Sequence, residues 1–313
     1  MKKIPVLMDC DPGHDDAIAL LLAHASPRLD LKGVTVVGGN QILDKTTVNA
    51  LKVLSYLGIN CPVARGCDKP LLREITTAPE VHGESGLDGP ELPPPGLELS
   101  PLHAIDLIRQ VIVDLPADEK LTLIPTGPLT NIALFLLRYP ELKSRIAHIS
   151  LMGGAALGGN WTPSAEFNIY VDPEAAHIVF ESGIPITMIG LDVTHRALIF
   201  PEDIERFRAI GNKAGRMTAE LLAFYSKFHA SHGYEGAPLH DPVAVAWVIE
   251  PGLVSTSPCH VSIETKSELT RGRTVTRQKE TLRGFTPNAL VGFDIDRPAF
   301  VDLLAEAITF YND

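Results

Sequence analysis

Positively charged residues are in short supply in this sequence. Its 313 residues include 27 lysines and arginines against 38 aspartates and glutamates, a formal net charge of −11. Binding to nucleic acid or to an anionic membrane surface depends on clustered cationic side chains. We therefore expect neither nucleic acid nor a membrane as a partner.

Cysteines and long apolar runs are also scarce. The four cysteines, Cys10, Cys61, Cys67 and Cys259, fit neither a disulfide framework nor a zinc site, which predicts reduced thiols and a cytoplasmic location. No apolar run approaches the roughly 18–20 residues of a membrane span. The first residues, MKKIPVLMDC, reach aspartate too early for a signal peptide.

Aromatic residues make up only 6% of the chain, whereas hydrophobic residues make up 45%. This balance favours a globular protein whose core is built from aliphatic side chains. The loop-like segment 76–100 contains PELPPPG, which excludes regular structure there, and no clean linker divides the chain. We predict a single domain over residues 1–313.

Short apolar runs alternate with amphipathic segments up to residue 200. The predicted strands are 4–9, 31–39, 121–127, 146–154 and 185–192. The predicted helices are 15–25, 45–58, 101–112, 129–140 and 173–183. Continuous Val/Ile/Leu strands that alternate with helices are typical of a parallel sheet covered on both faces. The fold class is therefore α/β, with an open, mostly parallel, Rossmann-like sheet.

Beyond residue 200 the pattern shifts towards helix. The predicted helices there are 206–230, 242–250 and 300–311, and the predicted strands are 259–265 and 288–296. We therefore expect a helix-rich C-terminal part within the same domain.

Polar or glycine-rich residues follow each of the five predicted parallel strands. In chain order they are Asp9 and Asp11; Gly39, Asn40 and Gln41; Thr126 and Gly127; Met152, Gly153 and Gly154; and Asp192. The carboxyl ends of parallel strands share one edge of the sheet, where such folds bind ligands. Loops are polar in most proteins, but aspartates clustered this tightly exceed ordinary loop polarity.

The first of these loops, LMDCDPGHDD (7–16), holds four aspartates within eight positions. Such a cluster of like charges suits a hard cation, and Ca²⁺ accepts several carboxylates together with carbonyl oxygens. Asp15 and Asp16 also begin a helix, where the dipole favours negative charge, so simple capping is the alternative for these two. Helix capping does not explain Asp9 and Asp11. Gly13 allows the loop to turn sharply.

Two further segments carry candidate site residues. In LHDP (239–242), Asp241 is either a second acidic site or a cap of the next helix, and His240 is either functional or packed. In the segment 158–176, Asn160, Glu166 and Asn168 precede a helix that starts near Pro173. Carboxamide and carboxylate groups in one loop are suited to hydroxyl recognition, as in a sugar.

These residues make the sequence resemble the inosine-uridine nucleoside hydrolase family. The matching motifs, in family order over nearly the whole chain, are DCDPGHDDAIA (9–19), GNQ (39–41), HGESGLDG (82–89), PTGPLTN (125–131), LMGGA (151–155), GNWTPSAEFNIYVDPEAA (159–176), GLDVTH (190–195) and PLHDP (238–242). The GNWTP stretch and His14 are most similar to the bacterial pyrimidine-preferring ribonucleoside hydrolases. The fold that the resemblance implies is the nucleoside hydrolase fold.

The resemblance implies hydrolysis of the N-glycosidic bond of ribonucleosides with one bound Ca²⁺. The implied metal ligands are the carboxylates of Asp11, Asp16 and Asp241 and the backbone carbonyl of Thr126. Asp11 is also implied as the general base that takes a proton from the attacking water. The implied substrate-binding residues are Asp15, Asn40, His82, Met152, Asn160, Glu166, Asn168 and Asp241.

His240 matches the family's active-site histidine and is the candidate acid for the leaving base. The base contacts are not assigned by the motifs, because the segment FHASHGYEGAP (228–238) departs from its relatives. His229, His232 and Tyr234 are the candidates there. Pyrimidine nucleosides are the predicted substrates; a purine- or inosine-preferring or broad-specificity hydrolase is the alternative. The resemblance also implies a homodimer or homotetramer.

Two other functions would account for part of this sequence. A haloacid-dehalogenase-like phosphatase also opens on DxD after a strand, but Gly13 stands where that class has Thr or Val, and Asn168 and His240 stay unexplained. A calcium-dependent nucleoside-binding protein would lack the base or the acid, whereas Asp11 and His240 are both present. An enzyme is therefore the favoured hypothesis.

Overall fold

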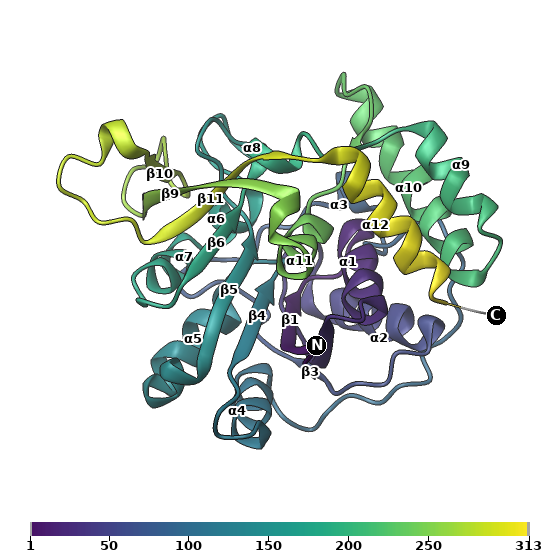
Figure 1. The fold of residues 1–313 in the computed structure, drawn as a ribbon, viewed down its shortest axis with the longest axis horizontal. Coiled ribbons are helices and arrows are strands. Elements are labelled where there is room, and N and C mark those ends of the chain that lie inside the picture. Colours follow the sequence, from purple (N-terminus) through teal and green to yellow (C-terminus); the bar gives the residue numbers. More distant parts are fainter. Residues whose placement is uncertain (1, 312–313) are drawn as a thin grey trace.

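The computed structural model describes residues 2–311 and centres on a nine-stranded sheet (Figure 1). The strands, in their order across the sheet, are β10 (Thr274–Arg277), β9 (Val254–Ile263), β11 (Ala289–Ile295), β6 (Ile186–Ile189), β5 (Ile146–Met152), β4 (Leu121–Pro125), β1 (Ile4–Cys10), β2 (Leu29–Val36) and β3 (Val63–Arg65). All pairings from β11 to β3 are parallel, and β9 runs antiparallel to both β11 and β10. The predicted open, mostly parallel α/β sheet is confirmed.

The strand order reverses at β1. The chain passes from β1 to β2 and β3 on one side, and then returns to β4, β5 and β6 on the other. At such a reversal the connections leave in opposite directions and open a crevice at the carboxyl ends of the strands. The loop that follows β1, with its aspartates, therefore lies at the point of the sheet best suited to bind a ligand.

Helices cover both faces of the sheet. Alternate residues of β1 divide between two separate cores: Val6 and Met8 pack in one, and Leu7 packs in the other. The first core contains side chains of α1 (His14–Ala25), α2 (Leu43–Leu57), α10 (Lys213–Ser231), α11 (Asp241–Ile249) and α12 (Arg297–Thr309). The second contains side chains of α4 (Ala104–Asp114), α5 (Thr130–Arg138) and α7 (Pro173–Phe180).

The helix predicted over 206–230 is wrong in one respect, because the structure has two helices there. Helix α9 (Pro201–Ala209) ends before Gly211, whose φ of +85° is the left-handed conformation that stops a helix. Asn212 then caps α10, accepting a hydrogen bond from Gly215 N at 2.8 Å. The break turns α10 towards the carboxyl ends of the strands, where its last turns reach the site.

Several short elements were not predicted. They are β3 and β10 at the sheet edges, the pair β7 (Leu198–Ile199) and β8 (Ala237–Pro238), the helices α3 (Pro79–His82), α6 (Phe167–Val171) and α8 (Leu191–Thr194), and the 3₁₀ turns Pro140–Arg145, Pro251–Leu253 and Lys279–Thr281. Helix α8 also shortens the strand predicted over 185–192, which ends at Ile189. Elements this short carry too few residues for a periodic pattern.

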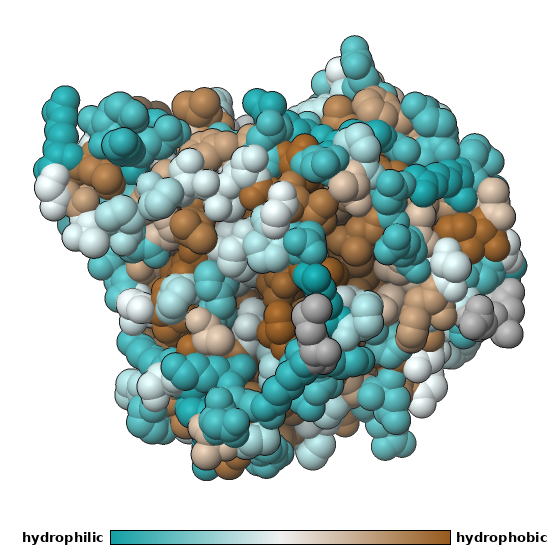
Figure 2. Space-filling model, viewed as in Figure 1, coloured by the Kyte–Doolittle hydropathy of each residue, from teal (hydrophilic) through white to brown (hydrophobic). Residues whose placement is uncertain are grey.

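Among residues 2–311, no helix is a candidate to cross a membrane. None of the described helices combines the length and the apolar character that a bilayer span requires. On the face seen in Figure 2, hydrophilic residues dominate the outer edges, and hydrophobic residues lie mainly towards the middle of the view.

Candidate active site

A cavity of about 590 Å³ opens at the carboxyl ends of β1, β2, β4 and β5. The predicted catalytic, metal-binding and substrate-binding residues that line it are Asp15, Asn40, His82, Thr126, Met152, Asn160, Glu166, Asn168, His240 and Asp241. Asp11 and Asp16 do not line the cavity; both are completely buried, Asp16 beside Asp15 and Asp241, and Asp11 against Asn40. Residues that lie far apart in the sequence are thus brought to one place.

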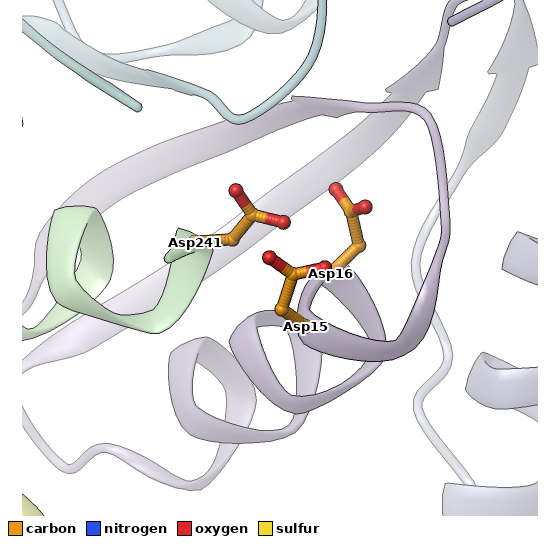
Figure 3. Close-up of side chains that lie close together, drawn as sticks. All are labelled: Asp15, Asp16 and Asp241. Carbon is orange, nitrogen blue, oxygen red and sulfur yellow. The ribbon is translucent and has the colours of Figure 1, made fainter. Parts of the chain in front are cut away.

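Three carboxylates form the acidic centre of this site. Carboxylate oxygens of Asp15, Asp16 and Asp241 all lie within 4.8 Å of one another (Figure 3). Asp15 and Asp16 belong to the first turn of α1, and Asp241 is the first residue of α11. Two helix N-termini, each favouring negative charge, therefore meet here. Asp16 also has the predicted capping role, since it accepts a hydrogen bond from Gly13 N at 3.0 Å.

Asp11 lies next to this centre with one oxygen held and one unpaired. Its Oδ2 accepts a hydrogen bond from Asn40 N at 2.6 Å, while its buried Oδ1 has no partner among residues 2–311. Gly39 and Gly127 pack so closely against this carboxylate that a Cβ on either residue would collide with it. Buried carboxylate oxygens are normally hydrogen-bonded, so this oxygen, which lies beside the acidic centre, is available to another ligand or to chemistry.

Burial is the main cause of abnormal pKa values in all four aspartates. It raises the pKa of Asp15 to about 7, and it raises the pKa of Asp16, Asp11 and Asp241 above the usual range. Repulsion by neighbouring carboxylates adds to the rise for Asp11, Asp15 and Asp241. Four buried carboxylates can ionise together only next to a cation. The set therefore fits an oxygen-preferring metal ion.

Thr126 contributes to this centre from the end of β4. Its hydroxyl donates to Asp16 Oδ1 at 2.7 Å, and its backbone carbonyl accepts from Asn168 Nδ2 at 2.8 Å. A carbonyl oxygen has two lone pairs, so one stays available to a cation after this hydrogen bond.

Two aspartates of the predicted rim serve other purposes. Asp9 does not line the cavity: its Oδ1 accepts from Thr35 Oγ1 at 2.6 Å and from Asn131 Nδ2 at 2.8 Å, while its buried Oδ2 has no partner among residues 2–311. Burial raises the pKa of Asp9 to about 7. Asp192 holds the loop after β5 by accepting from Ala156 N and Leu157 N at 2.6 and 3.1 Å. These hydrogen bonds give both side chains a structural role. The sequence did not predict this role, because the polarity of a strand end does not show which way a side chain points.

The side chains expected to bind ribose line the opposite wall of the cavity. Glu166 caps α6: its oxygens accept hydrogen bonds from Gly154 N and Asn168 N, both at 2.9 Å, and burial raises its pKa to about 7. Asn168 donates to the carbonyls of Thr126 and Met152 at 2.8 and 3.2 Å, which leaves its Oδ1 for a ligand. Asn160 accepts from Phe167 N at 2.9 Å.

His240 lines the cavity directly before Asp241 in the chain. Its Nδ1 lies 2.8 Å from Thr194 Oγ1, and its Nε2 has no hydrogen-bond partner within the described part of the chain. Burial holds the pKa of His240 well below its usual range, and His195, His229 and His82 add to the effect. The imidazole is therefore neutral at pH 7, with Nε2 free to interact with a ligand.

Aromatic rings and histidines form the outer wall. All three candidates for base contacts, His229, His232 and Tyr234, line the cavity. Other lining residues were not singled out from the sequence, among them Glu80, Trp161, His195, Tyr225 and Phe228. The spacing of residues 225, 228, 229 and 232 marks one face of α10 and was the available signal for Tyr225 and Phe228.

Comparison with known proteins agrees with this geometry. The family model described as "Inosine-uridine preferring nucleoside hydrolase" matches residues 6–302. A pyrimidine-specific ribonucleoside hydrolase RihA of Photobacterium profundum is 55% identical over 98% of this chain and 99% of its own length. The protein of the same name from Citrobacter koseri is 54% identical over 98% and 99%. A solved purine-preferring ribonucleoside hydrolase from Gardnerella vaginalis superposes with a TM-score of 0.90 at 34% identity, covering 97% of this chain and 98% of its own.

The fold, the carboxylate-rich cavity and these relatives together define an N-ribohydrolase, an enzyme that cleaves nucleosides by hydrolysis. The chain belongs to the inosine-uridine preferring nucleoside hydrolase family.

Proposed function

We propose that this enzyme is a calcium-dependent hydrolase that prefers pyrimidine ribonucleosides and releases ribose and the free base. The observation that carries the proposal is the unpaired Oδ1 of Asp11, buried beside the acidic centre of a cavity that also holds hydroxyl-binding groups. Cleavage of an N-glycosidic bond needs such groups together: a base for water, negative charge around the ribose, and an acid for the leaving group.

Asp11 is the general base in this mechanism. Its carboxylate takes a proton from water, whose oxygen forms the new bond to the anomeric carbon as the bond from that carbon to the base nitrogen breaks. Because Asn40 N holds Oδ2 at 2.6 Å, Oδ1 is the oxygen left to receive the proton. Positive charge develops on the ribose as the base departs, and the surrounding carboxylates stabilise that charge.

The acidic centre would hold the calcium ion through Asp11, Asp16, Asp241 and the carbonyl of Thr126, with Asp15 beside them. When bound, the ion supplies positive charge that lowers the pKa of nearby water and attracts ribose hydroxyls. Asp15 and the free Oδ1 of Asn168 face the cavity and accept hydrogen bonds from the ribose 2′ and 3′ hydroxyls. Glu166 and Asn160 bind the 5′ side, so that remote contacts fix the reacting geometry.

His240 assists the leaving base. The neutral ring can donate from Nε2–H to the base if Thr194 donates to its Nδ1, 2.8 Å away. We predict that His240→Phe lowers kcat by about a hundredfold with little change in KM, because proton donation matters only as the bond breaks. Steady-state ribose release from uridine measures both constants. A tenfold rise in KM with unchanged kcat would show instead that His240 only binds the base.

Pyrimidine preference is supported by the pyrimidine-specific relatives at 54–55% identity over almost the full chain. A purine-preferring or broad specificity is the alternative, favoured by the similarity to the Gardnerella vaginalis structure at 34% identity. We predict that kcat/KM for uridine and cytidine exceeds that for inosine by tenfold or more. Ribose release from the three nucleosides under identical conditions tests this, and an equal or higher value for inosine would contradict it.

The proposal includes a cytoplasmic location and a homo-oligomeric state, a dimer or a tetramer. All four cysteines are unpaired, which agrees with a reducing compartment. Sedimentation of the purified protein would measure the oligomeric state.

A further inference from the structure

Two buried histidines, His82 of the cavity wall and the neighbouring His14, meet through their Nδ1 atoms at 3.2 Å. His14 is fully buried and His82 is 5% exposed; their rings stack with Tyr225, and His14 also stacks on Phe224. Within residues 2–311 no carboxylate oxygen is hydrogen-bonded to either ring. A positive charge buried without a bonded partner is costly, so both rings are neutral and each carries one N–H.

The contact to Asp88 determines which nitrogen of His14 carries that proton. His14 Nε2 lies 2.7 Å from the backbone carbonyl oxygen of Asp88, and a carbonyl oxygen can only accept. The proton of His14 is therefore on Nε2, and its Nδ1 presents a lone pair to His82. The contact of 3.2 Å is a hydrogen bond only if His82 carries its own proton on Nδ1.

The carbonyl of Asp88 can fix the proton of His14 on Nε2, because several hydrogen bonds hold the turn formed by residues 82–89 in place. The Asp88 carboxylate accepts from Glu84 N and Ser85 N at 3.1 and 3.2 Å. Gln41 donates to Gly83 O at 3.1 Å, and Asn49 donates to Ser85 O at 2.9 Å.

Gly13 is an independent observation that supports the close contact between His82 and the start of α1. A Cβ on residue 13 would lie 2.5 Å from His82 Nδ1, so any other residue there would push the ring away. A competing contact exists from the backbone N–H of His14 to the same Nδ1, but it is longer, at 3.4 Å.

We propose that His14 is a positioning residue that holds His82 in its Nδ1–H tautomer, so that His82 Nε2 faces the nucleoside as a hydrogen-bond acceptor. His82 lines the cavity, and its Nε2 has no partner in the described part of the chain. The group that it would bind is an N–H or O–H of the nucleoside, such as the ring N–H of uracil, the amino group of cytosine or a ribose hydroxyl. This inference rests on the proposed nucleoside substrate, and it assigns His82 to binding rather than to proton donation.

Nitrogen NMR of ¹⁵N-histidine-labelled protein reads the tautomer directly, without turnover. The His82 signals are assigned by their loss in His82→Gln. We expect Nδ1 of His82 to be protonated and Nε2 to be unprotonated in the wild type. His14→Phe keeps a ring in the stack but removes both nitrogens, and should release His82 into a mixture of tautomers. His14→Asn, whose amide oxygen can accept at the place of Nδ1, should restore the Nδ1–H form.

Kinetics supply the second readout. His14→Phe should raise KM for uridine about tenfold, the loss of one oriented hydrogen bond, with kcat changed less than threefold. His24→Phe is the matched control, since His24 also lies among aromatic rings and bonds to Tyr311 OH at 2.9 Å, far from the cavity. It should leave the His82 signals and KM unchanged.

A wild-type His82 protonated on Nε2, or a tautomer unchanged in both His14 variants, would overturn the inference. Absence of nucleoside turnover in a protein with the expected tautomer would instead contradict the proposed function and leave the role of His14 standing.

Discussion

Replacing Asp11 with asparagine is expected to lower kcat for uridine by roughly a thousandfold or more. The substitution removes the carboxylate proposed as the general base, whose buried Oδ1 has no hydrogen-bond partner among residues 2–311, and with it one proposed ligand of the metal. Loss of general base catalysis alone costs between about a hundred and ten thousandfold. The measurement is kcat from ribose release at saturating calcium, which separates the loss of the base from weaker metal binding.

Asp9→Asn is the matched control for this substitution. Asp9 is equally buried and two residues away, but it bonds to Thr35 and Asn131 outside the cavity. We expect its kcat to stay within about threefold of the wild type. If Asp11→Asn kept more than a tenth of the wild-type kcat, another group would have to be the base.

Removal of divalent metal is expected to abolish turnover and to make the stability of the protein depend on pH. In the metal-free protein, burial raises the pKa of Asp15 from 3.8 to about 7 and raises those of Asp16, Asp11 and Asp241 as well. Between pH 3.8 and about pH 7, the folded state therefore binds more protons than the unfolded state. The stabilisation from these protonated groups is full below pH 3.8 and is lost as the pH rises towards about 7.

Calcium should reverse this loss, because it binds the ionised carboxylates of the folded state. At about a hundred times its dissociation constant, a ligand of the folded state adds about 2.7 kcal/mol to the free energy of unfolding. We therefore predict a larger rise in Tm on adding calcium at pH 7.5 than at pH 5, measured by thermal unfolding after chelation. An equal rise at both pH values would contradict a carboxylate site, and no rise at either would exclude calcium as its metal.

The parts of the fold that could be predicted are those with strong periodic patterns. Strands β1, β4 and β5 are short, mostly apolar runs that end at or next to Asp11, Thr126 and Met152, so their shared edge followed from parallel-sheet geometry. The break at Gly211 was missed because a glycine inside a helical pattern is often tolerated. Edge strands β3 and β10 have too few residues to show a pattern.

The candidate site was predictable in composition but not in every contact. The family resemblance implied that Asp11, Asp16, Asn168 and Asp241 share one site. In the structure, carboxylate oxygens of Asp16 and Asp241 lie within 4.8 Å of each other, and Asn168 donates to the carbonyl of Thr126, whose hydroxyl donates to Asp16. Which aspartates face inward could not be read from spacing: Asp15 joins the acidic centre, whereas Asp9 bonds to Thr35 and Asn131. The wall formed by α10 depends on how that helix packs after Gly211, which only the tertiary structure determines.

Release of ribose from uridine by metal-stripped protein, before and after calcium is restored, is the most direct test of the proposed mechanism. We predict no detectable ribose without metal, full activity when calcium returns, and at most about a thousandth of that activity in Asp11→Asn. Undiminished ribose release from the metal-stripped wild type, or equal release by the wild type and Asp11→Asn, would contradict the roles assigned to the acidic centre and to its unpaired carboxylate oxygen.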